Sequence, residues 1–204
     1  MEKRLTIEEL KQAKINRERI NQELKKTIKN CNTSIISCNC IGGIIYHDLG
    51  LKFLSPTINL FFTVEDFYKF VSNLDYYLSI EPTEYPSEYN YPIMLLDDIK
   101  LFCRHYNSFI EASEAWNRRK QRITNNIFII ATDQNHEQLE TLRKIDNLSY
   151  RKIIFTCNEQ LASELENGVY IPGYIKEVGH LDRFIDESGY RVYEKYFDVS
   201  TIFN

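Results

Sequence analysis

A short stretch of the chain combines side chains and turn residues that covalent chemistry requires. Residues 37–47 read SCNCIGGIIYH and follow directly on an apolar run. A nucleophilic thiol needs an exposed, electropositive turn, a base within hydrogen-bond reach and donors for an oxyanion. Cys40 meets the first requirement best because it precedes two glycines, whereas Cys38 lies within the run and is expected to be packed. The candidate bases are His47, which is close in sequence, and His105, which the fold would have to bring near.

The same stretch admits other interpretations, which the residues leave open. Gly42 and Gly43 would let backbone N–H groups approach a phosphate at a helix N-terminus, but the chain has neither G-x-G-x-x-G nor a P-loop lysine. Cys40 would otherwise line a ligand site or only shape a turn. No C-x-x-C pair and no H-x-x-x-H is present to complete a tetrahedral zinc site. We therefore expect no metal ion and no other cofactor.

A second group of candidates lies in the segment HYNSFIEASEAWNRRKQRI. Arg118 and Arg122 stand four residues apart on one expected helical face, with Arg119 and Trp116 on a neighbouring one. Guanidinium groups bind phosphates in bidentate fashion, and an indole can stack on a base or a sugar. A structural interpretation is equally open, because cations in the last turns complement the helix dipole and Trp116 suits a core-facing stripe.

Acidic residues offer one further candidate base, Asp98, in the segment MLLDDIKLF. If this segment is a strand, Asp97 and Asp98 point to opposite faces and cannot hold a metal ion together. No D-x-D sequence occurs in the chain. A nucleotide-sugar site that uses a divalent metal therefore lacks its usual sequence mark.

The elements that must position these residues alternate between strands and helices. Continuously apolar runs, typical of strands buried on both faces of a parallel sheet, cover 33–38, 57–62, 126–132 and 151–157. Helical patterns cover 64–78, 108–122, 136–146 and the residues from Asn158 to Gly168. This alternation predicts an α/β fold with an open, mostly parallel, Rossmann-like sheet and flanking helices.

Ligands of open α/β sheets gather at the carboxyl ends of the strands. This rule selects, in chain order, Asn39 to Gly43, Thr63, Asp133, Gln134, Cys157 and Asn158. Residues 79–92, SIEPTEYPSEYNYP, are expected to form a loop that is either a plain surface connection or a lid or aromatic acceptor platform.

The N-terminus is expected to form a long amphipathic helix. Thr6 and Glu9 read as a capping box, and a thin apolar stripe continues to Ile28. The helix would dock on the domain, pair with a second subunit, or, as a weaker alternative, lie peripherally on a membrane surface. The predicted organisation is this helix over residues 1–30 and a single α/β domain over residues 31–204.

Composition limits the class of protein. A chain of 204 residues with 43% hydrophobic residues can bury a substantial core, and its five cysteines are an odd number, which argues against a disulfide framework. The net charge is −4, which makes nucleic acid a poor candidate partner. The absence of a signal sequence and of a long apolar stretch predicts a cytoplasmic protein.

The sequence resembles a bacterial family of unknown function that is usually labelled exopolysaccharide biosynthesis proteins. The resemblance runs from about residue 33 to about residue 160 and rests on SIISCNCIGGIIYHDLGLKFLSPTINLFF, LDDIKLFCRHYNSFIEASEAWNRRKQRI, NIFIIATDQ and KIIFTC. The first family motif reads close to S-N-N-C-x-G-G, which corresponds here to Ser37, Cys38, Asn39, Cys40, Gly42 and Gly43. Cys38 departs from it, because the family typically has Asn there. Further positions that resemble the family are Ser55, Pro56, Thr57, Asp98, Ile99, His105, Tyr106, Trp116, Arg118, Arg119 and Arg122.

The resemblance implies a role in surface or capsular polysaccharide assembly but supplies no reaction. The first hypothesis is a metal-independent transferase that uses a nucleotide sugar or another phosphorylated donor, with the arginines on the diphosphate and His105 or Asp98 as base. The further donor-binding candidates are Asn39, Gly42, Gly43, Ser55, Thr57 and Trp116. The second hypothesis is a Cys40-dependent acyl transferase or hydrolase, and the third is a non-catalytic binding or scaffold protein whose basic N-terminal helix recruits a partner or a membrane. The same helix offers a surface for a homo-oligomer. From the sequence we favour glycosyl over acyl transfer.

Overall fold

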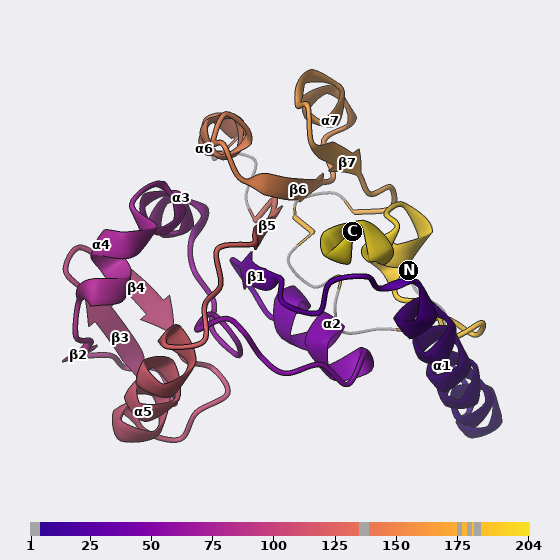
Figure 1. The fold of residues 1–204 in the computed structure, drawn as a ribbon, viewed down its shortest axis with the longest axis horizontal. Coiled ribbons are helices and arrows are strands. Elements are labelled where there is room, and N and C mark those ends of the chain that lie inside the picture. Colours follow the sequence, from indigo (N-terminus) through magenta and orange to yellow (C-terminus); the bar gives the residue numbers. More distant parts are fainter. Residues whose placement is uncertain (1–4, 135–138, 175–176, 179–180, 182–184) are drawn as a thin grey trace.

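The computed structural model describes residues 5–134, 139–174, 177–178, 181 and 185–204. Its centre is a four-stranded parallel sheet with the order β1-β5-β6-β7 (Figure 1). The strands are β1 (Ser34–Ser37), β5 (Ile127–Thr132), β6 (Arg151–Thr156) and β7 (Gly168–Tyr170). The predicted parallel α/β sheet is confirmed, and the first three strands match the predicted runs at 33–38, 126–132 and 151–157.

Helices cover both faces of this sheet (Figure 1). On one face lie α6 (Leu139–Asp146) and α7 (Glu159–Glu164), and on the other lie α2 (Ile41–Asp48) and the 3-10 helices η2 (Val192–Lys195) and η3 (Val199–Phe203). Successive strand residues enter different cores: Ile36 packs on the α6 side, and Ile35 packs on the α2 side. This two-sided burial explains why the strands are continuously apolar.

A second, antiparallel sheet is inserted between α2 and β5 and lies at the left of Figure 1. Its strands have the order β2-β3-β4 and comprise β2 (Thr83–Tyr85), β3 (Ile93–Leu96) and β4 (Ile99–Phe102). Three helices pack around it, namely α3 (Val64–Ser72), α4 (Leu74–Ser79) and α5 (Phe109–Lys120). The sequence did not predict this sheet: β2 lies within the segment 79–92, expected to be a loop, and β3 and β4 are runs of four residues interrupted by Asp97 and Asp98.

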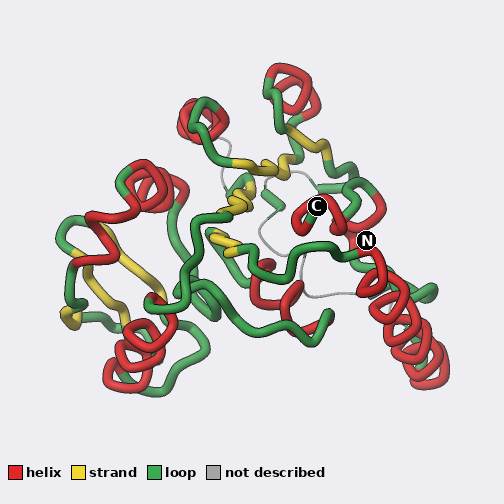
Figure 2. The backbone as a smooth tube through the Cα atoms, in the orientation of Figure 1, coloured by secondary structure: helices red, strands yellow, loops and turns green. Residues whose placement is uncertain are grey.

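The predicted strand at 57–62 is wrong. This segment is a loop (Figure 2), and only Phe61 forms an isolated antiparallel bridge, to Phe102. Asn59 has φ +64°, a left-handed conformation that ends any extended run. The predicted helix 64–78 is likewise divided at Asn73 into α3 and α4. Asp97 and Asp98 lie in the turn between β3 and β4, so the case considered above, in which both lie on a strand, does not apply.

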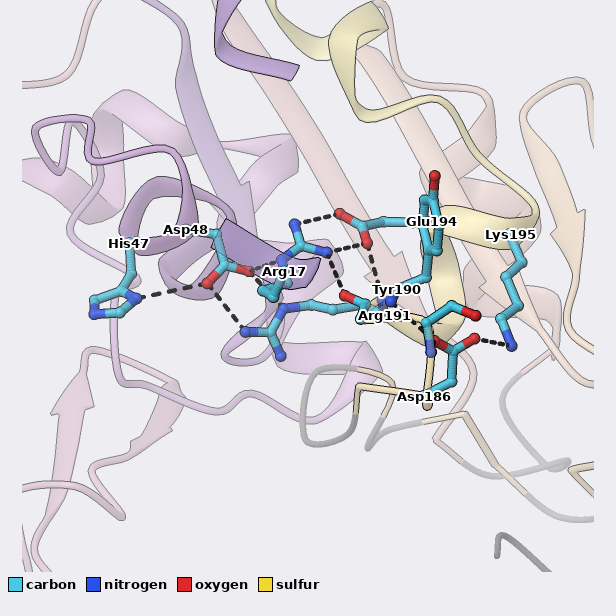
Figure 3. A network of polar contacts seen from close by, with 10 residues as sticks. Arg17, His47, Asp48, Asp186, Tyr190, Arg191, Glu194 and Lys195 are labelled. Atoms are coloured by element: carbon cyan, nitrogen blue, oxygen red, sulfur yellow. Dashed lines mark hydrogen bonds and ion pairs between the residues drawn. The ribbon is translucent and has the colours of Figure 1, made fainter. Parts of the chain in front are cut away.

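Helix α1 (Ile7–Thr27) begins with the predicted capping box of Thr6 and Glu9. It docks on the rest of the chain through a buried charge network, drawn in Figure 3. Arg17 of α1 makes two contacts with the carboxylate of Glu194, one of them Nη2 to Oε1 at 2.7 Å, and its Nε lies 3.4 Å from Asp48 Oδ2. Arg191 reaches the same Asp48 from the other side, with Nε at 2.6 Å and Nη2 at 3.1 Å. These four residues join α1, the end of α2 and η2.

Gly189 lets the backbone of α1 approach the C-terminal segment closely. It has φ +88°, and an added Cβ would lie 2.7 Å from both the Ala13 carbonyl oxygen and the Arg17 nitrogen. We therefore expect Gly189→Ala to lower the free energy of unfolding by about 3 kcal/mol, through backbone strain and overpacking together. The displaced α1 should also become sensitive to trypsin.

Gly173→Ala is the matched control, because Gly173 has φ +87° but would place no described atom within 4 Å of an added Cβ. It should therefore show the backbone strain alone, about 1 kcal/mol. Urea denaturation and limited trypsin digestion measure the two effects. Equal losses of stability in the two variants would contradict the docking of α1 on Gly189.

Candidate active site

A cavity of about 540 Å³ lies where the carboxyl end of β1 faces the end of β4. Its walls come from residues 39–47, the loop 53–61, residues 102–105 and Arg191. The described lining residues include two arginines, two histidines and three phenylalanines, and none of them is Asp or Glu. The cavity is therefore aromatic and cationic, although the whole chain carries a net charge of −4. Such a lining favours an anionic ligand.

Cys40 and His105 meet in this cavity. The distance from Cys40 Sγ to His105 Nε2 is 3.3 Å, although the two residues are 65 positions apart. Cys40 is the N-cap residue of α2 and is half-buried, and His105 is exposed in the turn after β4. The other candidate base, His47, lines the same cavity from the last turn of α2. The fold thus brings the thiol and the more distant histidine within hydrogen-bond reach.

The turn that carries Cys40 is fixed by hydrogen bonds on both sides. The Asn39 side chain accepts from the Ile41 nitrogen at 3.1 Å and donates to Thr132 Oγ1 of β5 at 3.0 Å. The hydroxyl of Ser37 donates to the Asn39 carbonyl at 2.7 Å and accepts from the Gly42 nitrogen at 3.2 Å. The start of α2 is therefore tied to the ends of two strands.

The two glycines of this turn have different surroundings. A Cβ on Gly42 would lie 2.7 Å from Ser37 Oγ, so Gly42 allows α2 to pack directly against β1. Gly43 lines the cavity, and a Cβ there would lie 3.3 Å from Ile58 Cγ2 on the opposite wall. Gly42 therefore lets α2 pack closely on β1, and Gly43 lets it pack closely on the loop at Ile58.

Ser55 and Thr57 are fully buried behind the cavity. Thr57 Oγ1 accepts from the Ser37 nitrogen at 3.2 Å, and Ser55 Oγ accepts from the Thr57 nitrogen at 3.2 Å. They hold the loop against β1. Neither is among the described lining residues of the cavity.

The three arginines near the end of α5 have different surroundings, and Arg122 lies beyond the last helical residue, Lys120. Arg119 Nη1 donates to the Ile58 carbonyl at 3.1 Å and to the Tyr106 hydroxyl at 2.5 Å, and its guanidinium lies 5.7 Å from the centre of the Phe53 ring. It thus supports two lining residues from behind. Arg118 and Arg122 do not line the cavity in the described part of the chain. Trp116 is buried in the core against Phe70, with ring centres 5.9 Å apart, and presents no face to a ligand.

Asp98 is placed away from the thiol. It precedes β4, whereas His105 follows it, so the strand separates them. Asp98 pairs with Lys69 Nζ at 2.6 Å and accepts from the Tyr77 hydroxyl at 2.7 Å. The hydrogen bond from Lys69 lowers the pKa of Asp98, and that from Tyr77 adds to the effect. The structure therefore does not bring Asp98 together with Cys40.

Sequence reasoning missed several lining residues. Arg104 lies with its guanidinium 4.8 Å from the centre of the Phe61 ring, and Arg191 enters from the C-terminal segment, held by Asp48. Asn59, with its left-handed backbone, also lines the cavity. Proximity to His105 in the chain was a usable signal for Arg104. No signal in the sequence indicates Arg191, which lies 143 residues from Asp48.

Other cysteines provide a contrast to Cys40. Cys38 is buried, as expected, and burial raises the pKa of its thiol. Burial first, and then the carboxylate of Asp133, raise the pKa of the Cys157 thiol to about 11.

Within the described residues no group of three or more His, Cys, Asp and Glu side chains is arranged to hold a metal ion. No helix there has the length and the apolar composition needed to cross a bilayer.

A protein family and a protein of known sequence each match nearly the whole chain. The sequence model of the family described as "Domain of unknown function (DUF1919)" matches residues 11–204. A protein of Haemophilus influenzae described as "Uncharacterized protein" is 34% identical over 189 residues, which cover 91% of this chain and 90% of that protein. Neither description names an activity or a polysaccharide.

Alkylation tests whether the thiols of Cys40 and Cys157 differ in reactivity. We expect iodoacetamide at pH 7.5 to modify Cys40 at least tenfold faster than Cys157. Both side chains are partly exposed, but the pKa of about 11 leaves Cys157 almost entirely protonated at this pH. Labelling of Cys157 should rise about tenfold per pH unit, because its thiolate fraction does so below the pKa. Peptide mass spectrometry measures both rates, and equal rates at pH 7.5 would contradict the expectation.

Proposed function

The chain belongs to the DUF1919 family, and from this premise we propose that it is a thiol-dependent acyltransferase with Cys40 as nucleophile and His105 as general acid and base. The observation that carries the proposal is the 3.3 Å contact between Cys40 Sγ and His105 Nε2 inside the cavity. A helix N-terminus and a neighbouring histidine both favour thiol reactivity, and Cys40 is the N-cap residue of α2 and lies beside the imidazole of His105.

The lining of the cavity supports an acyl donor that carries negative charge. Arg104 is a cation on its wall, the guanidinium of Arg191 on the same wall is already paired with Asp48, and no carboxylate is among the described lining residues. Arginine binds phosphate and carboxylate groups in a bidentate geometry. Phe61 and Phe102 offer apolar surface beside these cations for the remainder of the donor.

The proposed reaction has two balanced halves. In the first, the Cys40 thiolate attacks the carbonyl carbon of the donor, the bond to the leaving group breaks, and the His105 imidazolium gives its proton to the leaving group. In the second, the acceptor hydroxyl gives its proton to His105 and attacks the thioester. The carbon–sulfur bond then breaks, and Cys40 leaves as the thiolate. A water molecule in place of the acceptor would give hydrolysis.

A second candidate function is metal-independent glycosyl transfer, in which Arg104 and Arg191 would stabilise a departing diphosphate and His105 would act as base. The cation of Arg104 on the wall favours it as well. The donor site that the sequence predicts in the segment 108–122 has less support. Trp116 lies in the core, and Arg118 and Arg122 are not among the described lining residues of the cavity. Under either candidate, a role in exopolysaccharide assembly rests on the sequence resemblance alone.

Covalent labelling by acyl donors separates the two candidates. We expect acetyl-CoA, succinyl-CoA or p-nitrophenyl acetate to add an acyl group to Cys40, detected by intact and peptide mass spectrometry. Cys40→Ala should abolish the adduct, and His105→Asn should slow its formation by about two orders of magnitude, the usual contribution of a general acid or base. Cys31→Ser is the control, because Cys31 is an exposed thiol outside the cavity.

The opposite result would be a thermal shift with a nucleotide sugar that persists in Cys40→Ala, together with no acyl adduct from any donor. A ligand at about a hundred times its dissociation constant stabilises the folded state by about 2.7 kcal/mol, which a melting scan detects. That outcome would reject the acyltransferase in favour of glycosyl transfer.

Charge at the cavity wall should determine donor affinity. We expect Arg104→Ala to raise the concentration of anionic donor needed for half-maximal acylation by at least tenfold, because a charge-assisted contact is lost. Arg118→Ala is the matched control, an exposed arginine outside the cavity lining, and should leave this concentration unchanged. The neutral ester p-nitrophenyl acetate should show little difference between the two variants. An equal effect of both substitutions would indicate general charge attraction and not a binding site.

A further inference from the structure

A second pocket of about 730 Å³ lies beside the inserted sheet. It is formed by residues 84–92 and by the start of α5 at residues 107–110. Tyr89 and Tyr91 form its aromatic part, with parallel rings 5.0 Å apart at an angle of 3°. Tyr89 is 60% exposed, which is unusual for so large a side chain already stacked on another. Tyr89 therefore offers open aromatic surface.

Aromatic rings connect this pocket to the cavity of Cys40. Phe61 and Phe102 line the cavity, and their ring centres are 5.8 Å apart. The Phe102 ring lies 6.4 Å from that of Tyr89, which lines the second pocket. Arg104 lies over both ends of the row, 4.8 Å from the centre of Phe61 and 5.9 Å from that of Tyr91. The two pockets are thus joined by a continuous row of rings.

Polar groups border the rings of the second pocket. The amides of Asn90 and Asn107 each carry donors and an acceptor, and the carboxylate of Glu84 is an acceptor. These three side chains are exposed, and a ligand with hydroxyl groups can bond to them, whereas a lipid tail or an acyl chain offers them no hydrogen-bonding group. A ligand with flat apolar faces and a rim of hydroxyl groups would match both the rings and the amides. Sugar rings have this structure, because their C–H groups lie on the faces and their hydroxyls lie on the edge.

We infer that the aromatic row binds the acceptor, an oligosaccharide chain whose hydroxyl group reaches Cys40. The inference rests on the proposed acyl transfer to a hydroxyl, and it names the class of the acceptor. One end of the chain lies in the cavity of Cys40 and His105, and successive sugars continue over Phe102 and Tyr89. The side chains of Asn90, Asn107 and Glu84 bind the hydroxyl groups of the outer sugars.

Binding of defined glycans tests the inference. The probes are cellohexaose, maltohexaose and chitohexaose, together with a printed array of bacterial surface-polysaccharide fragments. Saturation-transfer NMR and titration calorimetry measure binding to the full chain. We expect at least one glycan to bind, and Tyr89→Ala and Tyr91→Ala to weaken it at least tenfold, since stacking on a ring is lost. Tyr89→Phe should retain most of the affinity, because it keeps the ring.

Tyr196→Ala is the matched control, because Tyr196 is also an exposed tyrosine, 43% exposed, but lies outside both pockets. Melting temperatures show whether each variant is folded. The inference is overturned if no glycan binds, or if the tyrosine variants bind as well as the wild type. It is also overturned if a proline-rich peptide binds the row while no glycan does, since aromatic grooves also recognise such peptides.

The same measurements in Cys40→Ala separate the two proposals. Glycan binding should persist there, because the rings do not depend on the thiol. Glycan binding without any acyl adduct on the wild-type Cys40 would reject the acyltransferase and keep the glycan site. An acyl adduct on Cys40 without any glycan binding would reject the glycan site and keep the acyltransferase.

Discussion

A buried network of two arginines and two carboxylates holds together three segments that are far apart in the chain. The Arg17 guanidinium contacts both Glu194 and Asp48, whereas the Arg191 guanidinium pairs with Asp48 and the Arg191 backbone nitrogen donates to Glu194. Each of the four side chains is at most 12% exposed. Buried charges are costly unless they are paired, and removal of one partner typically costs about 3–5 kcal/mol. Because Asp48 ends the helix that Cys40 begins, and Arg191 lines the cavity, the network also fixes two parts of the candidate site.

The loop between α2 and α3 joins the two sheets and thereby sets the distance between thiol and imidazole. On one side it bonds to β1, through Thr57 to Ser37 and through the Phe62 nitrogen to the Cys38 carbonyl at 2.9 Å. On the other side Phe61 pairs with Phe102 at the end of β4. Cys40 follows β1 and His105 follows β4, so their contact depends on this connection.

The loop also shows why local patterns fail at a functional site. Its segment TINLFF has the composition of a strand, but its residues pair with two sheets in turn and not along one strand. The left-handed Asn59 allows the change of direction and lines the cavity. Backbone strain of this kind is often concentrated where function requires a particular shape.

The sequence by itself determined the elements whose signals are local. Buried parallel strands are apolar throughout, and N-caps such as Thr6, Ser108 and Asn158 bond to backbone groups three residues away, as the structure has them. For the same reason the turn at Cys40 and the burial of Cys38 were predictable. Each of these predictions rests on residues that are close together in the chain.

Only the tertiary structure decided which residues surround Cys40. The choice of His105, the exclusion of Trp116 and Asp98 from the cavity, and the entry of Arg191 all depend on contacts across many tens of residues. The same holds for α1, whose docking requires Gly189 and Glu194 at the other end of the chain. Such contacts follow from the packing of two sheets around one loop, and packing leaves no periodic signal in the sequence.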